Sequence, residues 1–385
     1  MSYSPLRMHY HPKFGQDKVE VLSGRASLYS QKVLSAIKSL GNHFIIITDD
    51  NVRRFIGNDF QKYLRSHNLQ AKLFSFIPGE KNKTEKTLKR IIHFMHRESM
   101  NSDSCVIALG GGITTDLGGF AASIFCRGVT LINIPTSLIG MTDAAIGGKT
   151  GINVLGTKNL IGQIYHPRLI IIDPILLNSS SERQFIEGYS EILKYAITLD
   201  ASLFRYLESE NPPFDIDQIE FLIYRSCLRK IDILKAAKKQ AVKRDILNFG
   251  HTIAHALETL TNHALSHGQA VKIGLITESF ISLRSNYLSE VHFQRIHQLI
   301  LKYGIMKIPN DFSKSNFLKT IKKDKKSLKN IPRFVILNKI GSCFQDLNNC
   351  CFVIKEPIID EAYYFLKHAL YLNTEYRFLK NSKNR

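Results

Sequence analysis

The chain has 385 residues, a length that fits two or three domains and most simply two. Hydrophobic residues make up 44% and charged residues 22%, which excludes a mainly disordered or fibrous chain. Lysine and arginine number 52 against 33 acidic residues, and the resulting net charge of +19 favours anionic ligands. No stretch approaches ~18 uninterrupted apolar residues, and the first ten residues lack the apolar core of a secretory signal. We therefore expect no membrane span and a cytoplasmic protein.

Two features of the composition restrict the partners and the redox state. The basic clusters come without zinc-finger spacing, an aromatic RNA-binding signature or a basic region leading into heptads, so no nucleic-acid partner is expected. The six cysteines show no CxxC spacing and are expected to be reduced and mostly structural. Cys350 and Cys351 are adjacent and therefore poorly placed to chelate one metal together.

The first part of the chain alternates short apolar runs with helical spacing. Apolar, β-branched runs predict strands at residues 43–48, 72–77, 104–109, 131–134 and 169–172. Helical spacing appears between them, most clearly at residues 84–98 and 116–124. Strands that alternate with helices predict a mostly parallel, Rossmann-like sheet covered by helices.

The pattern changes to helix after about residue 180. Helices are expected at residues 181–197, 216–242, 246–260 and 270–285, with a small strand pair near 333–337 and 351–354. The sequence thus predicts an α/β N-terminal domain over residues 1–175 and a mainly α-helical C-terminal domain over residues 176–385.

A first glycine-rich segment, ALGGGITTDLGGF, follows the expected strand at 104–109 and opens a helix. Gly110, Gly111 and Gly112 let backbone N–H groups approach an anion at the helix N-terminus. The segment predicts a dinucleotide pyrophosphate site at the carboxyl end of a strand. It is not the GxGxxG fingerprint, so a purely structural tight turn stays open.

A second glycine-rich segment, DAAIGGKTGINVLGTKN, spans residues 143–159. It superficially resembles a Walker loop, but Asp143 stands where GxxxxGK needs glycine, which excludes a P-loop NTPase. Lys149 and Lys158 are suited to binding phosphate or carboxylate, with solvated loop lysines as the alternative.

Histidine and glutamate spacing points to a metal. Glu191 and Lys194 share one helix face at i, i+3, and His251 and His255 share another at i, i+4. With His267, two imidazoles and one carboxylate would form a catalytic zinc pattern with an open position. Spacing leaves open which two histidines bind, and His263 is a fourth candidate. Residue 252 is Thr, not the Glu of HExxH, so a metalloprotease is unsupported.

Eight motifs in order carry a resemblance to a known family: PGEKNK, GGGITTD, RGVTLINIPTS, TDAAIGGKTGIN, LGTKNLIGQIYHP, EGYSEILKYAI, NFGHTIAHALE and HGQA. Over roughly residues 48–274 the chain resembles the 3-dehydroquinate synthase family. The resemblance implies a lyase that depends on NAD and on Zn²⁺ or Co²⁺. It would convert 3-deoxy-D-arabino-heptulosonate 7-phosphate to 3-dehydroquinate and phosphate, on the route to chorismate and the aromatic amino acids. The implied steps are transient oxidation, β-elimination, re-reduction and intramolecular aldol closure.

The resemblance also implies roles for individual residues. The implied metal ligands are Glu191, His251 and His267. The implied catalytic residues are Asp143, Lys149, Lys194, Lys235 and His255, with Lys238 or Lys239 as alternatives to Lys235. The implied substrate-binding residues are Arg127, Asn159, Arg244, Asn248, Lys325 and Lys326, and Arg127 would reach the phosphate in the neighbouring subunit of a homodimer. The implied NAD contacts are Asp49, Asn51, Pro78, Gly79, Glu80, Lys81, Asn82, Lys83, Gly111, Gly112, Ile113, Thr114, Thr115, Asp116, Thr136, Ser137, Lys149, Lys158, Leu176, Leu177, Asn178 and Ser179.

Three other functions stay open at this level. A related cyclase acting on another sugar phosphate is disfavoured by Arg244, which offers a bidentate fork for a substrate carboxylate. A polyol dehydrogenase is disfavoured by Lys149 and Lys158. A basic binding protein that has lost catalysis is disfavoured by the presence of the complete implied metal-ligand set.

Overall fold

The structure is a computed structural model that describes residues 6–12, 18–179, 182–239, 241–308, 311–322, 331–346 and 349–368. The chain forms two compact units, the first from Met1–Tyr195 and Pro213–Arg244, the second from Ala196–Pro212 and Asp245–Arg385. The chain therefore passes between the units three times. The boundary that the sequence suggests at residue 175 stays a prediction.

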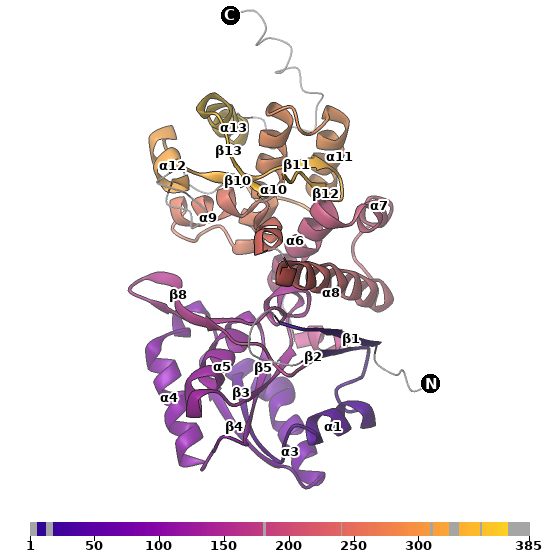
Figure 1. The fold of residues 1–385 in the computed structure, drawn as a ribbon, viewed down its shortest axis with the longest axis vertical. Helices are drawn as coiled ribbons and strands as arrows, with labels where there is room; N and C mark the ends of the chain where they lie inside the picture. Colours follow the sequence, from indigo (N-terminus) through magenta and orange to yellow (C-terminus); the bar gives the residue numbers. More distant parts are fainter. Residues whose placement is uncertain are drawn as a thin grey trace, which may run out of the picture. The chain divides into compact units, whose positions relative to one another are not determined.

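The first unit is built on a seven-stranded sheet (Figure 1). Its strands are β1 (Leu6–Tyr10), β2 (Val19–Ser23), β3 (His43–Asp49), β4 (Gln70–Phe76), β5 (Cys105–Gly110), β6 (Thr130–Pro135) and β9 (Leu169–Ile172). The order is β1-β2-β9-β6-β5-β3-β4, and every neighbouring pair is parallel except β1 with β2. This confirms the predicted mostly parallel sheet, and its five expected strands are β3, β4, β5, β6 and β9.

Helices cover both faces of this sheet (Figure 1). The helices of the first unit are α1 (Gln31–Lys38), α2 (Asp50–Val52), α3 (Asn58–Ser66), α4 (Glu85–Arg97), α5 (Gly112–Ile124) and α8 (Ile216–Lys239), and α6 (Glu182–Leu199) begins there and ends in the second unit. Ile91 of α4 and Leu117 of α5 pack against Val106 of β5 in one core cluster. The Thr84 side chain accepts a hydrogen bond from Thr87 N and so fixes the start of α4.

The strand order creates a topological switch point between β3 and β5. After β3 the chain moves outward to β4, and it then returns to β5 on the other side of β3. The connections that leave β3 and β5 therefore diverge at the carboxyl edge of the sheet, where open α/β sheets bind their ligands. β3 ends at Asp49 and β5 ends at Gly110, the first of the three predicted cradle glycines.

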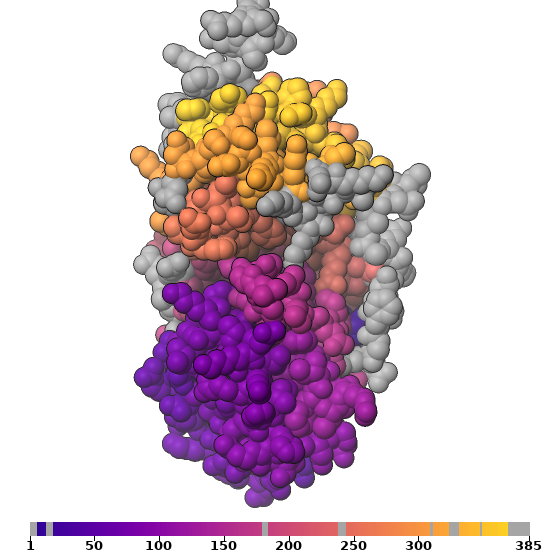
Figure 2. Space-filling model, turned by 90° about the vertical axis from the view of Figure 1, so that its left-hand side faces the viewer, coloured from indigo at the N-terminus to yellow at the C-terminus, as the bar shows by residue number. Residues whose placement is uncertain are grey.

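A second sheet in the first unit is the two-stranded hairpin of β7 (Lys149–Val154) and β8 (Thr157–Ile164). The sequence did not predict it, because its Gly and Asn residues break the apolar alternation that marks a strand. Every residue of β8 is exposed. Figure 2 shows one face of the N-terminal part of this unit, coloured indigo to purple.

The second unit is mainly helical, as predicted. Its helices are α7 (Ala201–Ser209), α9 (His251–Leu260), α10 (His267–Arg284), α11 (Glu290–Lys302), α12 (Lys314–Ile321) and α13 (Glu356–His368). Short strands accompany them: β10 (Arg333–Val335), β11 (Leu337–Lys339), β12 (Ser342–Cys343) and β13 (Cys351–Val353). The antiparallel pair of β10 and β13 is the strand pair that the sequence suggested. Within the described residues, none of the helices combines the length and apolarity needed to cross a membrane.

Candidate active site

The glycine segment after β5 forms an open cradle at the switch point. α5 begins right after Gly111, which offers no side-chain cap, so the first backbone N–H groups of the helix remain available. Gly110 must be glycine, because a Cβ there would lie 2.5 Å from Oγ1 of Thr114. On the neighbouring strand, Thr136 N donates to Gly110 O at 3.1 Å, and Ser137 Oγ accepts from Gly140 N at 3.2 Å.

The buried Lys83 side chain is the centre of a polar group beside this cradle. Lys83 is 3% exposed, and its ammonium donates to Asp116 on α5 and to Asn159 on β8. Burial raises the pKa of Asp116, and the Lys83 ammonium opposes that shift. Asn153 joins the group by donating to Glu80 Oε1 at 2.7 Å and accepting from Asn159 N at 2.8 Å. The structure thus brings together four predicted site residues from the PGEKNK loop, α5 and the hairpin.

Asp49 lies at the end of β3, where the predicted ribose-binding carboxylate belongs. Its Oδ1 accepts from Asn51 N at 2.9 Å and from Val52 N at 3.0 Å, which caps α2. The remaining predicted nucleotide contacts of the first unit divide by burial. Lys83, Thr114, Thr115, Thr136, Ser137, Leu176 and Leu177 are buried, whereas Asn51, Pro78, Gly79, Lys81, Lys149, Lys158 and Asn178 are exposed. The side chain of Ser179 lies outside the described residues.

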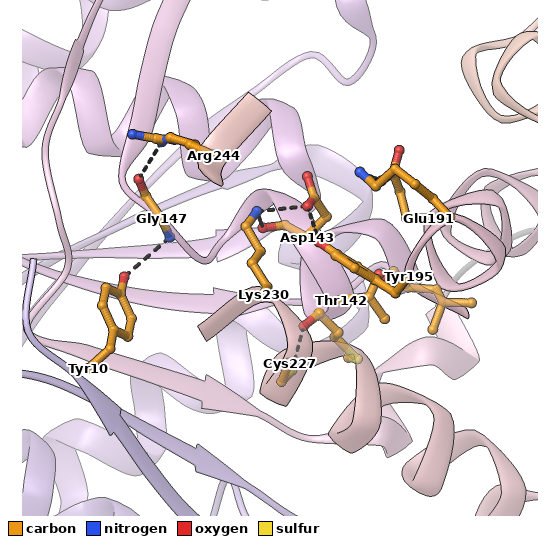
Figure 3. A network of polar contacts seen from close by, with 12 residues as sticks. Tyr10, Thr142, Asp143, Gly147, Glu191, Tyr195, Cys227, Lys230 and Arg244 are labelled. Atoms are coloured by element: carbon orange, nitrogen blue, oxygen red, sulfur yellow. Dashed lines mark hydrogen bonds and ion pairs between the residues drawn. The ribbon is translucent and has the colours of Figure 1, made fainter. Parts of the chain in front are cut away.

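Asp143 is the centre of a second polar network, drawn in Figure 3. It lies on a π-type turn over Gly140–Ala144 that follows β6. Tyr195 from α6 donates its hydroxyl to Asp143 Oδ1 at 2.5 Å. Lys230 from α8 donates to the same oxygen at 2.8 Å and also to the Asp143 carbonyl. Three elements far apart in sequence therefore hold one carboxylate.

Burial and the neighbouring charges shift the pKa values of the three side chains in this network. Burial would raise the pKa of Asp143, but the Lys230 and Lys194 ammonium groups outweigh it and hold that pKa below its usual range. Burial lowers the pKa of Lys230 to about 8, although Asp143 opposes the shift. Burial, with Asp143 beside it, raises the pKa of Tyr195, so this hydroxyl stays protonated and able to donate. The network presents an ionised aspartate that is held by a cation and a neutral donor.

Lys230 is the functional candidate that the sequence reasoning missed. It is 5% exposed and contacts Asp143, whereas Lys235, the predicted catalytic lysine, is exposed one and a half turns further along α8. The side chains of Lys238 and Lys239, the two alternatives, lie outside the described residues. The helical spacing of apolar residues could have identified Lys230 as buried. Cys227 and Ile231, three residues before and one after it, are buried on α8, so Lys230 lies on the inward face of this helix.

Arg244, Gly147 and Tyr10 form a second chain of hydrogen bonds in the same view (Figure 3). Arg244 donates to Gly147 O at 3.2 Å, and Gly147 N donates to the Tyr10 hydroxyl at 3.2 Å. That hydroxyl lies 3.2 Å from Nδ1 of His166. Burial lowers the pKa of His166 to about 4, and Arg244 adds to the shift. His166 is therefore neutral at pH 7 and holds Tyr10 in place.

Glu191 and Lys194 lie one turn apart on α6 and are both buried, at 1% and 2% exposure. The Lys194 ammonium donates to Glu191 Oε2. Burial disfavours the charged form of Lys194, but Glu191 and Asp143 overcome it and raise the lysine pKa. The Glu191 carboxylate therefore lies in direct contact with one buried cation.

In the second unit, three predicted histidines lie close together. The His251 ring centroid lies 5.6 Å from that of His267 and 5.6 Å from that of His255. His251 Nδ1 lies 3.1 Å from Phe249 O, so the protonated nitrogen faces a carbonyl and Nε2 is left as the ligand atom. His267 Nδ1 faces Glu258 Oε2 at 3.6 Å, the same pairing of imidazole with an oxygen acceptor. His263 is exposed in the turn after α9.

The start of α9 is set by two neighbours on α10. Glu278 is fully buried and its carboxylate accepts from Gly250 N at 2.8 Å, Thr252 N at 3.0 Å and Ile253 N at 3.3 Å. A Cβ on Gly274 would lie 2.0 Å from Gly250 O, so the two helices approach as closely as this only with glycine there. This packing explains why α9 begins at His251 instead of near residue 246.

The other predicted substrate residues lie in both units. Asn248 is half-buried at the end of the 3-10 segment Ala241–Asn248 in the second unit. Arg127 of the first unit is exposed after α5, at a φ of 63° that strains a non-glycine residue. Lys325 and Lys326 lie outside the described residues.

The fold of this chain matches that of a class of solved synthases that share the same overall architecture. 2-Deoxy-scyllo-inosose synthase, solved with carbaglucose-6-phosphate, NAD⁺ and Co²⁺, matches with a TM-score of 0.83 at 24% identity, over 92% of this chain and 98% of that one. 2-Epi-5-epi-valiolone synthase from Streptomyces hygroscopicus, solved with NAD⁺ and Zn²⁺, matches with a TM-score of 0.78 at 24% identity, over the same shares. These likenesses describe the fold.

Sequence comparison identifies the family within this class. The 3-dehydroquinate synthase N-terminal model matches residues 73–187 and the C-terminal model matches residues 188–327. The 3-dehydroquinate synthase of Clostridium beijerinckii is 34% identical over 85% of this chain and 93% of its own length. That of Thermoanaerobacter pseudethanolicus is 36% identical over 77% and 84%. The chain belongs to the 3-dehydroquinate synthase family, which confirms the resemblance found in its sequence.

Proposed function

We propose that the chain catalyses the 3-dehydroquinate synthase reaction, the conversion of 3-deoxy-D-arabino-heptulosonate 7-phosphate to 3-dehydroquinate and phosphate. The observation that carries the proposal is the Asp143 network, in which a carboxylate is held by Lys230 and Tyr195 in the same unit as a glycine cradle for a nucleotide. Family membership supports the same reaction.

The first unit fits NAD. The uncapped N-terminus of α5 after Gly111 suits a pyrophosphate, and the Asp49 carboxylate at the end of β3 suits a ribose hydroxyl. The buried Lys83 lies beside this position and adds a positive charge.

The donor set also fits a divalent metal. His251 and His267 each have Nδ1 against an oxygen acceptor, which leaves Nε2 of both rings as ligand atoms. Glu191 is the third ligand of this proposal, since a buried carboxylate together with two imidazoles suits Zn²⁺ or Co²⁺. When bound, NAD accepts and returns a hydride and the metal polarises a substrate hydroxyl and the ketone it becomes.

The remaining residues bind, orient and move protons. Lys149, Lys194 and Arg244 supply positive charge for the substrate's carboxylate and phosphate, and Arg244 offers the bidentate fork. Asp143 is oriented by Lys230 and Tyr195, so that it accepts from a substrate hydroxyl in one fixed position. Asn159 and Asn248 also bind the substrate. His255 transfers protons to and from it.

We further propose a homodimer in which Arg127 reaches the substrate of the neighbouring subunit. β8 pairs with β7 alone among the described strands, and its Leu160, Ile161 and Ile164 are 50%, 43% and 49% exposed. An apolar strand edge of this kind is a ready surface for a second chain. A cytoplasmic location also stays a prediction.

Intersubunit complementation tests the dimer. Arg127→Ala and Lys230→Met are each expected to be inactive, but a refolded equimolar mixture forms hybrid dimers with one intact site. About a quarter of wild-type activity per chain should return. If mixing restores nothing, Arg127 serves its own subunit.

The activity itself is tested by phosphate release from the heptulosonate phosphate. Release should require both NAD and a divalent metal, and should stop with a chelator and resume with Zn²⁺. Glucose 6-phosphate, which lacks the carboxylate, serves as the alternative substrate. Faster release from glucose 6-phosphate would overturn the proposed substrate.

A further inference from the structure

Two adjacent cysteines and an aspartate form a compact polar cluster in the second unit, apart from the histidines described above. Asp245, Cys350 and Cys351 each offer one ligand atom, and these three atoms lie within 4.8 Å of one another. Both cysteines are buried, at 0% and 1% exposure, and neither forms a disulfide. Sequence adjacency suggested that the pair is poorly placed to chelate one metal together, but the structure brings both sulfurs and a carboxylate oxygen into one cluster.

The local backbone explains how adjacent thiols come to lie together. Consecutive residues within a strand point to opposite faces. Cys350 lies in a bend immediately before β13, so this alternation begins only at Cys351, which pairs with Val335 of β10. The two thiols are within hydrogen-bonding reach of each other as a result. Asp245 approaches from the 3-10 segment Ala241–Asn248.

Arg333 fixes the chain on which these cysteines lie. Its Nε and a terminal nitrogen donate to Cys351 O at 3.1 and 2.6 Å, and the same terminal nitrogen donates to Asn349. The clamp holds the cysteine pair in place and brings a permanent positive charge close to it. An ion bound by two thiolates and a carboxylate would carry a net charge of −1, which this guanidinium offsets.

The geometry points to a second metal site: we propose that Asp245, Cys350 and Cys351 bind a thiophilic divalent cation such as Zn²⁺. Two sulfurs and one carboxylate oxygen supply three ligands of a tetrahedral site, and water supplies the fourth. Each ion displaces the two thiol protons as two metal–sulfur bonds form, so binding releases two protons to solvent.

The state of the thiols without metal agrees with this. The contact with Cys351, together with burial, raises the pKa of Cys350, and burial raises that of the nearby Cys343. Asp245 directly follows Arg244 and precedes Asn248, so the ion would tie β13 to the segment that leads into His251.

Cobalt titration of the full chain, stripped of metal and kept under a phosphine reductant, tests this site. Thiolate bound to Co²⁺ gives an intense charge-transfer absorption in the near ultraviolet, which the histidine and glutamate donors of the proposed catalytic site cannot give. We expect this band to reach the intensity of one thiolate-bound Co²⁺ per chain, while a second Co²⁺ fills the proposed catalytic site without contributing to the band. The result is independent of catalysis, so failure here and failure of the proposed function can be told apart.

Matched variants complete the test. The double variant Cys350→Ser/Cys351→Ser should lose the band, whereas Cys126→Ser, which removes an exposed thiol, should retain it. Asp245→Asn keeps both thiols and should weaken Co²⁺ binding by at least about tenfold. If the double variant fails to fold, a disulfide reagent tests the site instead. Zn²⁺ should then slow the reaction of the wild-type thiols, and it should slow the reaction less in Asp245→Asn. A missing band in the wild type, or a band that persists without both cysteines, overturns the proposal.

Discussion

Lys230 carries the sharpest prediction at the scale of single residues. Its ammonium contacts the Asp143 carboxylate and carbonyl, while Lys235 is exposed on the same helix. Lys230→Met should lower kcat for phosphate release by about 10²–10³-fold, because Asp143 loses its orientation and the site loses a positive charge. The measurement is steady-state phosphate release, with NAD binding followed in parallel as a check on folding.

Lys235→Met is the matched comparison, since it removes the same group one and a half turns away. We expect less than about a twofold change in kcat, the scale of an exposed substitution. A loss in Lys235→Met that equals the loss in Lys230→Met would restore the assignment made from the sequence.

His166 gives a prediction about pH. Its pKa is lowered to about 4 by burial and by Arg244, below the value of about 6.5 in an unfolded chain. Between these values the unfolded state binds more protons, so stability falls as the pH drops from 6.5 towards 4, by at most about 3 kcal/mol.

The check is the free energy of unfolding by urea at several pH values, for the wild type and for His166→Gln. The groups that face this ring are the Tyr10 hydroxyl and the Arg244 guanidinium. The variant should show a shallower fall in stability, and equal pH slopes for the two proteins would contradict the role of His166.

At the scale of elements, Glu278 joins α10 to the start of α9. Three backbone N–H groups donate to its buried carboxylate, and α9 begins with the proposed metal ligand His251. Glu278→Ala should cost about 3 kcal/mol of unfolding free energy, because three buried donors lose their acceptor. Denaturant unfolding measures this loss.

Ser289→Ala provides the control, since Ser289 caps α11 by accepting from His292 N at 3.4 Å and does not touch α9. It should cost about 1 kcal/mol. Equal costs for the two variants would show that Glu278 is not the main support of α9.

The sequence predicted elements well where one periodicity dominated. β9 lies at 169–172 as expected and α4 at 85–97 within one residue, because continuous apolar runs and helical spacing are strong local signals. The β7–β8 hairpin was missed, since its glycines and asparagines serve the site and give no alternation. α9 began five residues later than expected, because the cap on its first turn comes from a glutamate on another helix.

The sequence motifs predicted most residues of the candidate site, but they did not predict which of these residues contact one another. The ordered motifs pointed to Asp143, Lys149 and the histidines, whose residue types are unusual enough to stand out. Lys230 was missed because a single lysine in a basic helix carries no local mark of its burial. Only the three-dimensional pairing with Asp143 distinguishes it from Lys235.

At the scale of the whole molecule, the net charge of +19 should act on an anionic substrate. A positive field raises the rate of encounter with a carboxylate and a phosphate, and salt screens it. Raising NaCl from about 0.05 M to about 0.5 M should lower kcat/KM on the order of 3–10-fold. An uncharged osmolyte at matched osmolality is the control, and a salt-independent kcat/KM would refute steering by net charge.

The central claim is that this chain uses NAD as a catalyst and not as a consumed oxidant. The most direct measurement follows 3-dehydroquinate, phosphate and reduced nicotinamide together during many turnovers of the heptulosonate phosphate. The account predicts 3-dehydroquinate and phosphate in equal amounts, with no net build-up of reduced nicotinamide. Reduced nicotinamide that accumulates in step with turnover, as a polyol dehydrogenase would produce, would contradict it.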